Sequence, residues 1–331
     1  MDVWHYDASK ERRNLYVTFQ LTRWCNYSCP YCFDGCHEKT QPWPRRDGKI
    51  ATLSDRLFPR RRSSAHAFDN YPVHRWVEAI QKIAAGRMIS LKITGGEPFL
   101  DTPNVLALLK GILPLVSVDP IRFDTNGTFD PNDYRGLTLE KVFLNVSYHP
   151  SHIRRDAFLA KVRAIAAAGF RIGMVTMVVT PSQRREFETV KEACLRLGLH
   201  VNPNPRLEQP DARFSDYDHA FFSRFLVPFD VENKLHRTDL QRVRCRFPQI
   251  GLQIDPDGKI YNACFTKRKT DIFRASANSL NTLLAETACF CPRQTCHCTN
   301  MYSFQVGQSR NNASMETMGS YVRNALIVPE G

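Results

Sequence analysis

The chain has 331 residues, of which 43% are hydrophobic and 24% charged, and its formal net charge at pH 7 is +12. This composition is typical of a globular protein and argues against extensive disorder. No apolar run approaches the roughly 18 residues of a membrane-spanning helix, and residues 1–13 lack the apolar core of a secretory signal, so we expect a cytoplasmic protein without membrane contact. The positive charge favours an anionic partner, but no nucleic-acid-binding motif accompanies it, so we do not expect nucleic acid.

Short strands alternate with helices along most of the chain. The expected strands are residues 15–21, 89–94, 120–124, 141–147, 171–179 and 199–202, and the expected helices are 73–85, 105–113, 154–168 and 184–197. This alternation is typical of parallel strands joined by crossover helices. Six strands predict an α/β fold, a partial (β/α)6 TIM-like barrel, with an open doubly wound sheet as the alternative.

Two segments depart from this pattern, and they suggest how the chain divides into domains. A polar insertion rich in Pro and Arg, at residues 37–71, is too long for an ordinary connection and interrupts the barrel, which we assign to residues 1–210. A helical linker is expected at residues 211–244, with one helix over 216–235. A small C-terminal cysteine-rich module follows at residues 245–300, with strands 251–254 and 260–262 around an Asp-Pro-Asp-Gly turn and a helix at 278–285, and residues 301–331 form a tail.

The eleven cysteines are odd in number and gather towards the two ends of the chain, which favours metal or cluster ligation over a disulfide framework. The first group is Cys25, Cys29 and Cys32, on the loop after the first strand. Three thiolates on one loop can hold three irons of a cubane cluster and leave the fourth iron without a protein ligand. A zinc site is the alternative, with Cys36 or His37 as the fourth ligand.

A second motif, Thr94-Gly95-Gly96-Glu97-Pro98, follows the second strand, at the end where α/β barrels place their functional loops. The two glycines let a ligand approach the backbone, and Glu97 offers a carboxylate to a cation. Together with the three-cysteine loop, this motif resembles the radical S-adenosylmethionine superfamily, and the resemblance extends over residues 15–205.

The resemblance implies that Cys25, Cys29 and Cys32 hold a [4Fe–4S] cluster whose fourth iron is chelated by S-adenosylmethionine. The other expected contacts with this cofactor are Tyr31 beside the adenine, the backbone and carboxylate of Gly95, Gly96 and Glu97 at the methionine ammonium, Asn126 after the third strand, and Ser147 at the ribose. It also implies reductive cleavage of S-adenosylmethionine to a 5′-deoxyadenosyl radical, which abstracts hydrogen from the substrate. His149 is interpreted as a structural hydrogen-bonding residue, and no catalytic residue is identified.

Six further cysteines lie between Cys245 and Cys298. A cysteine, a Pro-Asp-Gly turn and a second cysteine, Cys264, resemble the C-terminal extension called the twitch or SPASM domain, which implies one auxiliary [4Fe–4S] cluster. Its expected ligands are Cys245 and Cys264, completed by two of Cys291, Cys296 and Cys298. A zinc ribbon is the alternative.

We therefore interpret the chain as an enzyme that oxidises, epimerises or rearranges a polar small molecule, which can be anionic, such as a sugar, nucleoside or antibiotic intermediate. The setting would be natural-product biosynthesis, with a flavodoxin or ferredoxin as reductant. The second hypothesis is a maturase of a ribosomal precursor peptide, although the barrel begins near residue 15 and leaves no room for an N-terminal peptide-recognition module. The third is a non-catalytic zinc or cluster protein that binds nucleic acid.

Overall fold

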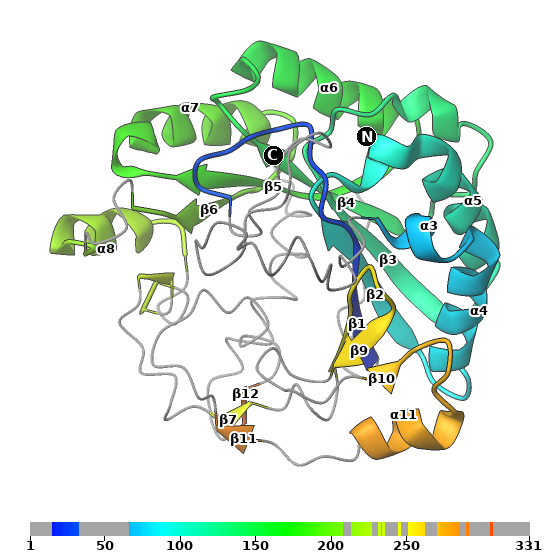
Figure 1. The fold of residues 1–331 in the computed structure, drawn as a ribbon. Coiled ribbons are helices and arrows are strands. Elements are labelled where there is room, and N and C mark those ends of the chain that lie inside the picture. The colour runs from blue at the N-terminus through cyan, green and yellow to red at the C-terminus, as the bar shows by residue number, and fades with distance from the viewer. Residues whose placement is uncertain are drawn as a thin grey trace, which may run out of the picture.

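The computed structural model describes residues 15–32, 66–207, 213–226, 231–232, 234–235, 244–245, 251–261, 270–284, 289–290 and 305–306. Within these residues the main element is a nine-stranded sheet with the order β10-β9-β8-β1-β2-β3-β4-β5-β6 (Figure 1). The six strands expected from the sequence are consecutive neighbours in it, and each pairs with the next in parallel. The predicted α/β partial barrel is confirmed.

The barrel strands and their connections follow the predicted order. The strands are β1 (Leu15–Thr22), β2 (Ile89–Gly95), β3 (Val118–Thr125), β4 (Val142–Tyr148), β5 (Arg171–Val179) and β6 (Val201–Pro205). The helices are α3 (Ala67–Asn70), α4 (Val73–Ile83), α5 (Thr102–Ile112), α6 (Arg155–Ala167) and α7 (Arg184–Leu195), with short 3₁₀ turns η1 (Pro98–Asp101), η2 (Pro131–Tyr134) and η3 (Pro181–Gln183). Helices α4 to α7 lie along the outer face of the curved sheet (Figure 1).

The two faces of the sheet differ in polarity. On the outer face Phe19 of β1 stacks on Trp76 of α4, with ring centroids 4.6 Å apart, and Tyr148 of β4 packs on Phe158 of α6 at 4.8 Å. Burial of side chains of this size contributes about 1.5–3 kcal/mol each. Because successive strand residues point to opposite faces, the residues between these apolar ones face the barrel interior.

The predicted hairpin is present, and it continues the barrel sheet. Strand β8 (Gly251–Ile254) pairs in parallel with β1, and β9 (Lys259–Tyr261) and β10 (Thr270–Asp271) follow it outwards. At the turn, Asp255 Oδ1 accepts hydrogen bonds from the backbone N–H groups of Asp257 (3.1 Å) and Lys259 (2.9 Å). The part of the cysteine-rich segment that the hairpin occupies therefore shares a sheet with the barrel.

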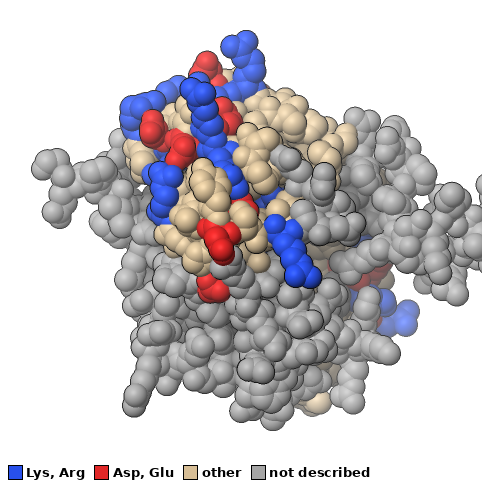
Figure 2. Space-filling view, turned by 90° about the vertical axis from the view of Figure 1, so that its left-hand side faces the viewer, with Lys and Arg blue, Asp and Glu red and all other residues tan. Residues whose placement is uncertain are grey.

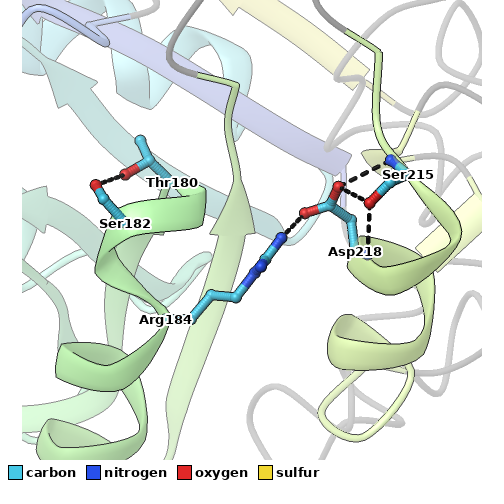
Figure 3. Close-up of polar contacts among 5 residues, drawn as sticks. All are labelled: Thr180, Ser182, Arg184, Ser215 and Asp218. Carbon is cyan, nitrogen blue, oxygen red and sulfur yellow. Dashed lines mark hydrogen bonds and ion pairs between the residues drawn. The ribbon is translucent and has the colours of Figure 1, made fainter.

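The helix expected over residues 216–235 is shorter in the structure. Helix α8 (Asp216–Phe222) begins with a capping box between Ser215 and Asp218, and Arg184 of α7 donates to the Asp218 carboxylate (Figure 3). Helical hydrogen bonds continue to Leu226, whose N–H donates to the carbonyl of Phe222 (3.0 Å), shortly before Pro228, a residue type that disfavours helix continuation. Residues 231, 232 and 234 are helical again, so the expected helix is present in two described parts.

The rest of the cysteine-rich segment is described only in part. Strands β7 (Arg244–Cys245), β11 (Cys289–Phe290) and β12 (Gln305–Val306) form a second sheet, and helix α11 (Ala277–Leu284) matches the expected one. The expected ligands Cys264, Cys291, Cys296 and Cys298 lie outside the described residues, as do Cys36 and His37. The auxiliary module and the domain boundaries remain predictions.

The side of the molecule that carries α7 and α8 has basic and acidic side chains next to one another (Figure 2). Arg224, for example, lies 2.9 Å from Glu188. This face is therefore mixed in charge, and the most basic segment of the chain, residues 37–65, lies outside the described residues. None of the described helices is long and apolar enough to span a membrane.

Candidate functional site

The loop that follows β1 carries three partly buried cysteines that form no disulfide, Cys25, Cys29 and Cys32. The N–H of Cys32 donates to the carbonyl of Cys29 (3.0 Å), which turns the loop back on itself. Among the described residues, no three His, Cys, Asp or Glu side chains lie close enough together to hold a metal ion.

Burial sets the proton affinity of the first thiol. It raises the pKa of Cys25 to about 12, and the N–H of Tyr27, which donates to the Cys25 sulfur at 3.4 Å, offsets part of this increase. Cluster binding requires the thiolate, so binding of a cluster to Cys25 would release a proton. Protons and the cluster would therefore compete for this sulfur.

The cysteine loop rests on Gly95, the last residue of β2, and Gly96, the residue after it. Gly96 donates its N–H to the carbonyl of Thr22 (2.9 Å), and Glu97 donates its N–H to the carbonyl of Trp24 (2.7 Å). A Cβ at Gly95 would lie 2.1 Å from the Thr22 oxygen, and one at Gly96 would lie 1.8 Å from the Trp24 oxygen. We expected these glycines to admit a ligand, but the backbone that approaches them here is that of the cysteine loop.

The Glu97 carboxylate is fully buried and accepts hydrogen bonds from the protein itself. Its Oε1 accepts from the N–H of Phe99 (3.1 Å) and the hydroxyl of Thr125 (2.7 Å), and its Oε2 accepts from the N–H of Asn126 (2.6 Å). Burial raises the pKa of Glu97 to about 7, although the N–H of Asn126 lowers it. The side chain expected to face a ligand thus links the end of β2 to the end of β3 in this structure.

Asn126 connects the end of β3 to the cysteine loop. Its side-chain nitrogen lies 2.8 Å from Oδ1 of Asn26 and 3.8 Å from the Cys25 sulfur, and its Oδ1 accepts from the Thr128 hydroxyl (2.6 Å). Asn26 donates in turn to that hydroxyl (2.9 Å). The sequence analysis did not identify Asn26 or Thr128. The only signals were that Asn26 is next to Cys25 and that Thr128 is two residues after Asn126.

Tyr31 lies against His149 of the loop after β4. Their rings are parallel with centroids 6.1 Å apart, and the Tyr31 hydroxyl oxygen is 3.2 Å from His149 Nδ1. The same nitrogen lies 3.5 Å from the Cys29 sulfur. These contacts agree with the expectation that His149 makes a structural hydrogen bond. Tyr31 itself is buried, with 8% of its surface exposed. Burial raises the pKa of Tyr31 and lowers that of His149 to about 4, so both rings are neutral at pH 7.

The barrel interior contains charged and polar groups that sequence reasoning did not single out. Lys92 Nζ on β2 lies 2.7 Å from the carboxylate of Asp124 on β3, which also accepts from Thr94 (3.2 Å) and Asn145 (3.0 Å). Burial lowers the pKa of Lys92, but Asp124 more than offsets this, so the pKa is raised and the amine is charged. The available signal was a polar residue at alternate positions of each strand.

Ser147, the expected ribose contact, lies on this inner face. Its hydroxyl is 2.9 Å from that of Thr176, its neighbour on β5. The structure therefore brings Cys25, Glu97 and Asn126 together directly. It places Ser147 on the same inner face, hydrogen-bonded to β5.

The comparisons with known proteins show a shared fold. No family model and no curated protein matches the chain. A solved structure described as native anSMEcpe with bound AdoMet is 14% identical, with a TM-score of 0.54 and 80% of each chain covered. Streptococcus suis SuiB bound to S-adenosylmethionine is 11% identical, with a TM-score of 0.55, and SuiB bound to the precursor peptide SuiA is 12% identical, also at 0.55. In both SuiB structures the match spans 66% of the SuiB chain and 83% or 84% of this one.

The buried Glu97 carboxylate predicts a specific pH dependence of stability. Its pKa of about 7 in the folded protein lies above the usual 4.5, so between these values the folded state holds a proton that the unfolded state has lost. The free energy of unfolding should therefore fall as pH rises from 4.5 to 7, by about 3 kcal/mol at 1.36 kcal/mol per pKa unit, relative to Glu97→Gln. Chemical denaturation across this range measures it.

Exposed Glu140 provides the matched control. Glu140→Gln should follow the pH dependence of the unmodified protein. A difference between the Glu97→Gln variant and the unmodified protein that is independent of pH would show that the carboxylate does not titrate in this range.

Proposed function

We propose that this chain is a radical S-adenosylmethionine enzyme. The observation that carries the proposal is the position of the three-cysteine loop, which backbone hydrogen bonds hold on Gly96 and Glu97 at the carboxyl edge of a partial barrel. Barrels of this kind place their chemistry at that edge. Support comes from anSMEcpe and SuiB, which share the fold and are described with S-adenosylmethionine bound.

The donor set suits a [4Fe–4S] cluster. Cys25, Cys29 and Cys32 form no disulfide, and three thiolates leave one iron for the amino and carboxylate groups of S-adenosylmethionine. When bound, the cluster would supply the electron that cleaves S-adenosylmethionine to the 5′-deoxyadenosyl radical. Neighbouring residues would hold it in place: the Tyr31 hydroxyl hydrogen-bonds to Cys29, and Asn126, at the end of β3, lies beside Cys25.

The proposed cofactor contacts follow the expectation except for Glu97 and Asn126. Tyr31 would contact the adenine and Ser147 the ribose, and the backbone of Gly95–Glu97 would receive the methionine ammonium. The Glu97 carboxylate acts instead as a support, because its three protein donors already hold it. Asn126 would act indirectly, by holding the cysteine loop through its hydrogen bond to Asn26.

The substrate would be a polar molecule bound inside the barrel. The Lys92–Asp124 ion pair and Ser147 support this, because an interior packed only for stability is filled by branched apolar side chains. A polar small molecule is the leading candidate. A peptide is the second, favoured by the structures of SuiB with precursor peptide SuiA and of anSMEcpe with the Cp18Cys peptide. The reductant would be a flavodoxin or ferredoxin in the cytoplasm.

The C-terminal segment would hold one auxiliary [4Fe–4S] cluster. The register of β7 and β11 pairs Cys245 with Cys289, which adds Cys289 to the candidate ligands. The proposed set is otherwise unchanged, with Cys245, Cys264 and two of Cys291, Cys296 and Cys298.

Loss of any one thiol of the first loop should abolish S-adenosylmethionine cleavage. Cys25→Ala, Cys29→Ala and Cys32→Ala each remove a cluster ligand, so the anaerobically reconstituted, dithionite-reduced variants should form 5′-deoxyadenosine only at the level of a protein-free control. Chromatographic measurement of 5′-deoxyadenosine tests this. Cys194, which is buried in α7, provides the control: Cys194→Ala should retain cleavage. Cleavage retained in any of the three loop variants contradicts the proposal, and no cleavage by the unmodified protein favours a non-catalytic cluster or zinc protein.

The auxiliary cluster should survive removal of all three loop thiols. The Cys25/Cys29/Cys32→Ala triple variant should bind about four irons and four sulfides per chain, and the unmodified protein about eight irons, as expected for one and two [4Fe–4S] clusters. Metal and sulfide analysis measures this. About one or two zinc ions per chain without sulfide would identify a zinc ribbon instead.

A further inference from the structure

His149 contacts the cysteine loop from the end of β4. Its Nδ1 atom lies 3.5 Å from the Cys29 sulfur, which is within hydrogen-bonding range for sulfur, and 3.2 Å from the Tyr31 hydroxyl oxygen. Aromatic rings hold the imidazole on two sides, because Tyr31 lies parallel to it and Tyr27 meets it edge-on at 5.5 Å. The ring is therefore positioned on this sulfur by packing as well as by its polar contacts.

The direction of the hydrogen bond depends on the state of the sulfur. A thiol can donate to Nδ1, but a thiolate is only an acceptor, so its neighbours must donate to it. His149 can do this from Nδ1–H, in the neutral tautomer that carries its proton on Nδ1. The Tyr31 hydroxyl also hydrogen-bonds to Cys29 and lowers the pKa of that thiol, which burial raises overall.

We propose that His149 is a positioning residue that donates a hydrogen bond from Nδ1 to the Cys29 thiolate and thereby raises the reduction potential of the cluster held by the first cysteine loop. This inference rests on the proposed function. Reduction adds one negative charge to the cluster and its thiolates, so a donor aimed at a ligand sulfur stabilises the reduced form more than the oxidised form. His149 would then make the cluster easier for a protein reductant to reduce.

Two substitutions separate the hydrogen bond from packing. His149→Phe keeps a ring beside Tyr31 and removes the donor, whereas His149→Asn places an amide N–H near the position of Nδ1. His152→Phe is the matched control, because His152 stacks on Tyr27 (4.3 Å) and its variant keeps that ring contact. Each reconstituted protein is titrated with redox mediators without substrate, and the electron paramagnetic resonance signal that responds to added S-adenosylmethionine is followed.

The midpoint potential of His149→Phe should be more negative by about 59 mV, which corresponds to a tenfold less favourable one-electron reduction. His149→Asn should recover most of this shift, and His152→Phe should match the unmodified protein. Equal potentials in His149→Phe and the unmodified protein, or no recovery in His149→Asn, would overturn the inference. Loss of the first cluster from both His149 variants would also overturn it, because His149 would then be an iron ligand. If the unmodified protein binds no cluster at this loop, the proposed function itself fails.

Discussion

Two backbone hydrogen bonds, from Gly96 to Thr22 and from Glu97 to Trp24, hold the cysteine loop on the end of β2. They require that no side chain stands between the two segments, because a Cβ on Gly96 would lie 1.8 Å from the Trp24 oxygen. The rest of the site depends on this contact. Once the Glu97 backbone is fixed, its carboxylate reaches the end of β3, and the hydrogen bonds of Asn126 return from there to the cysteine loop. The ends of β1, β2 and β3 are thus linked to one another and to the cysteine loop by hydrogen bonds.

The electrostatic character of the site follows from its burial. Glu97 is held by three donors in a region without solvent, and its raised pKa shows that these hydrogen bonds do not fully replace water. In the barrel interior, Lys92 and Asp124 form an ion pair. Apolar side chains could fill the same space without loss of stability, so stability does not require this pair. Both side chains are only partly buried, with exposed fractions of 24% for Lys92 and 30% for Asp124, so a polar ligand in the interior can hydrogen-bond to them. This accords with the proposed substrate.

Local sequence patterns were sufficient for the barrel and insufficient for the site. Each strand has its own alternation and each helix its own apolar face, so β1 to β6 and α4 to α7 could be predicted without knowledge of tertiary contacts. The expected helix over residues 216–235 was too long, because Pro228, which disfavours helix continuation, lies within it. Two of the three hydrogen-bond donors to Glu97 are 28 and 29 residues away, and Cys29 is 120 residues from His149. No local pattern encodes such pairs, so the motif identified the residues while the roles of Glu97 and His149 needed the structure.

The central claim is that the three-cysteine loop leaves one iron open to S-adenosylmethionine. Electron–nuclear double resonance on the reduced protein, with S-adenosylmethionine carrying ¹⁷O in its carboxylate and ¹⁵N in its amino group, tests it directly. Coordination to that iron predicts hyperfine coupling from both labels, and Cys25→Ala should lose both couplings. A reduced cluster at this loop that shows no coupling to either label, and whose spectrum does not change when S-adenosylmethionine is added, would contradict the claim, because a fourth protein ligand would then close the site.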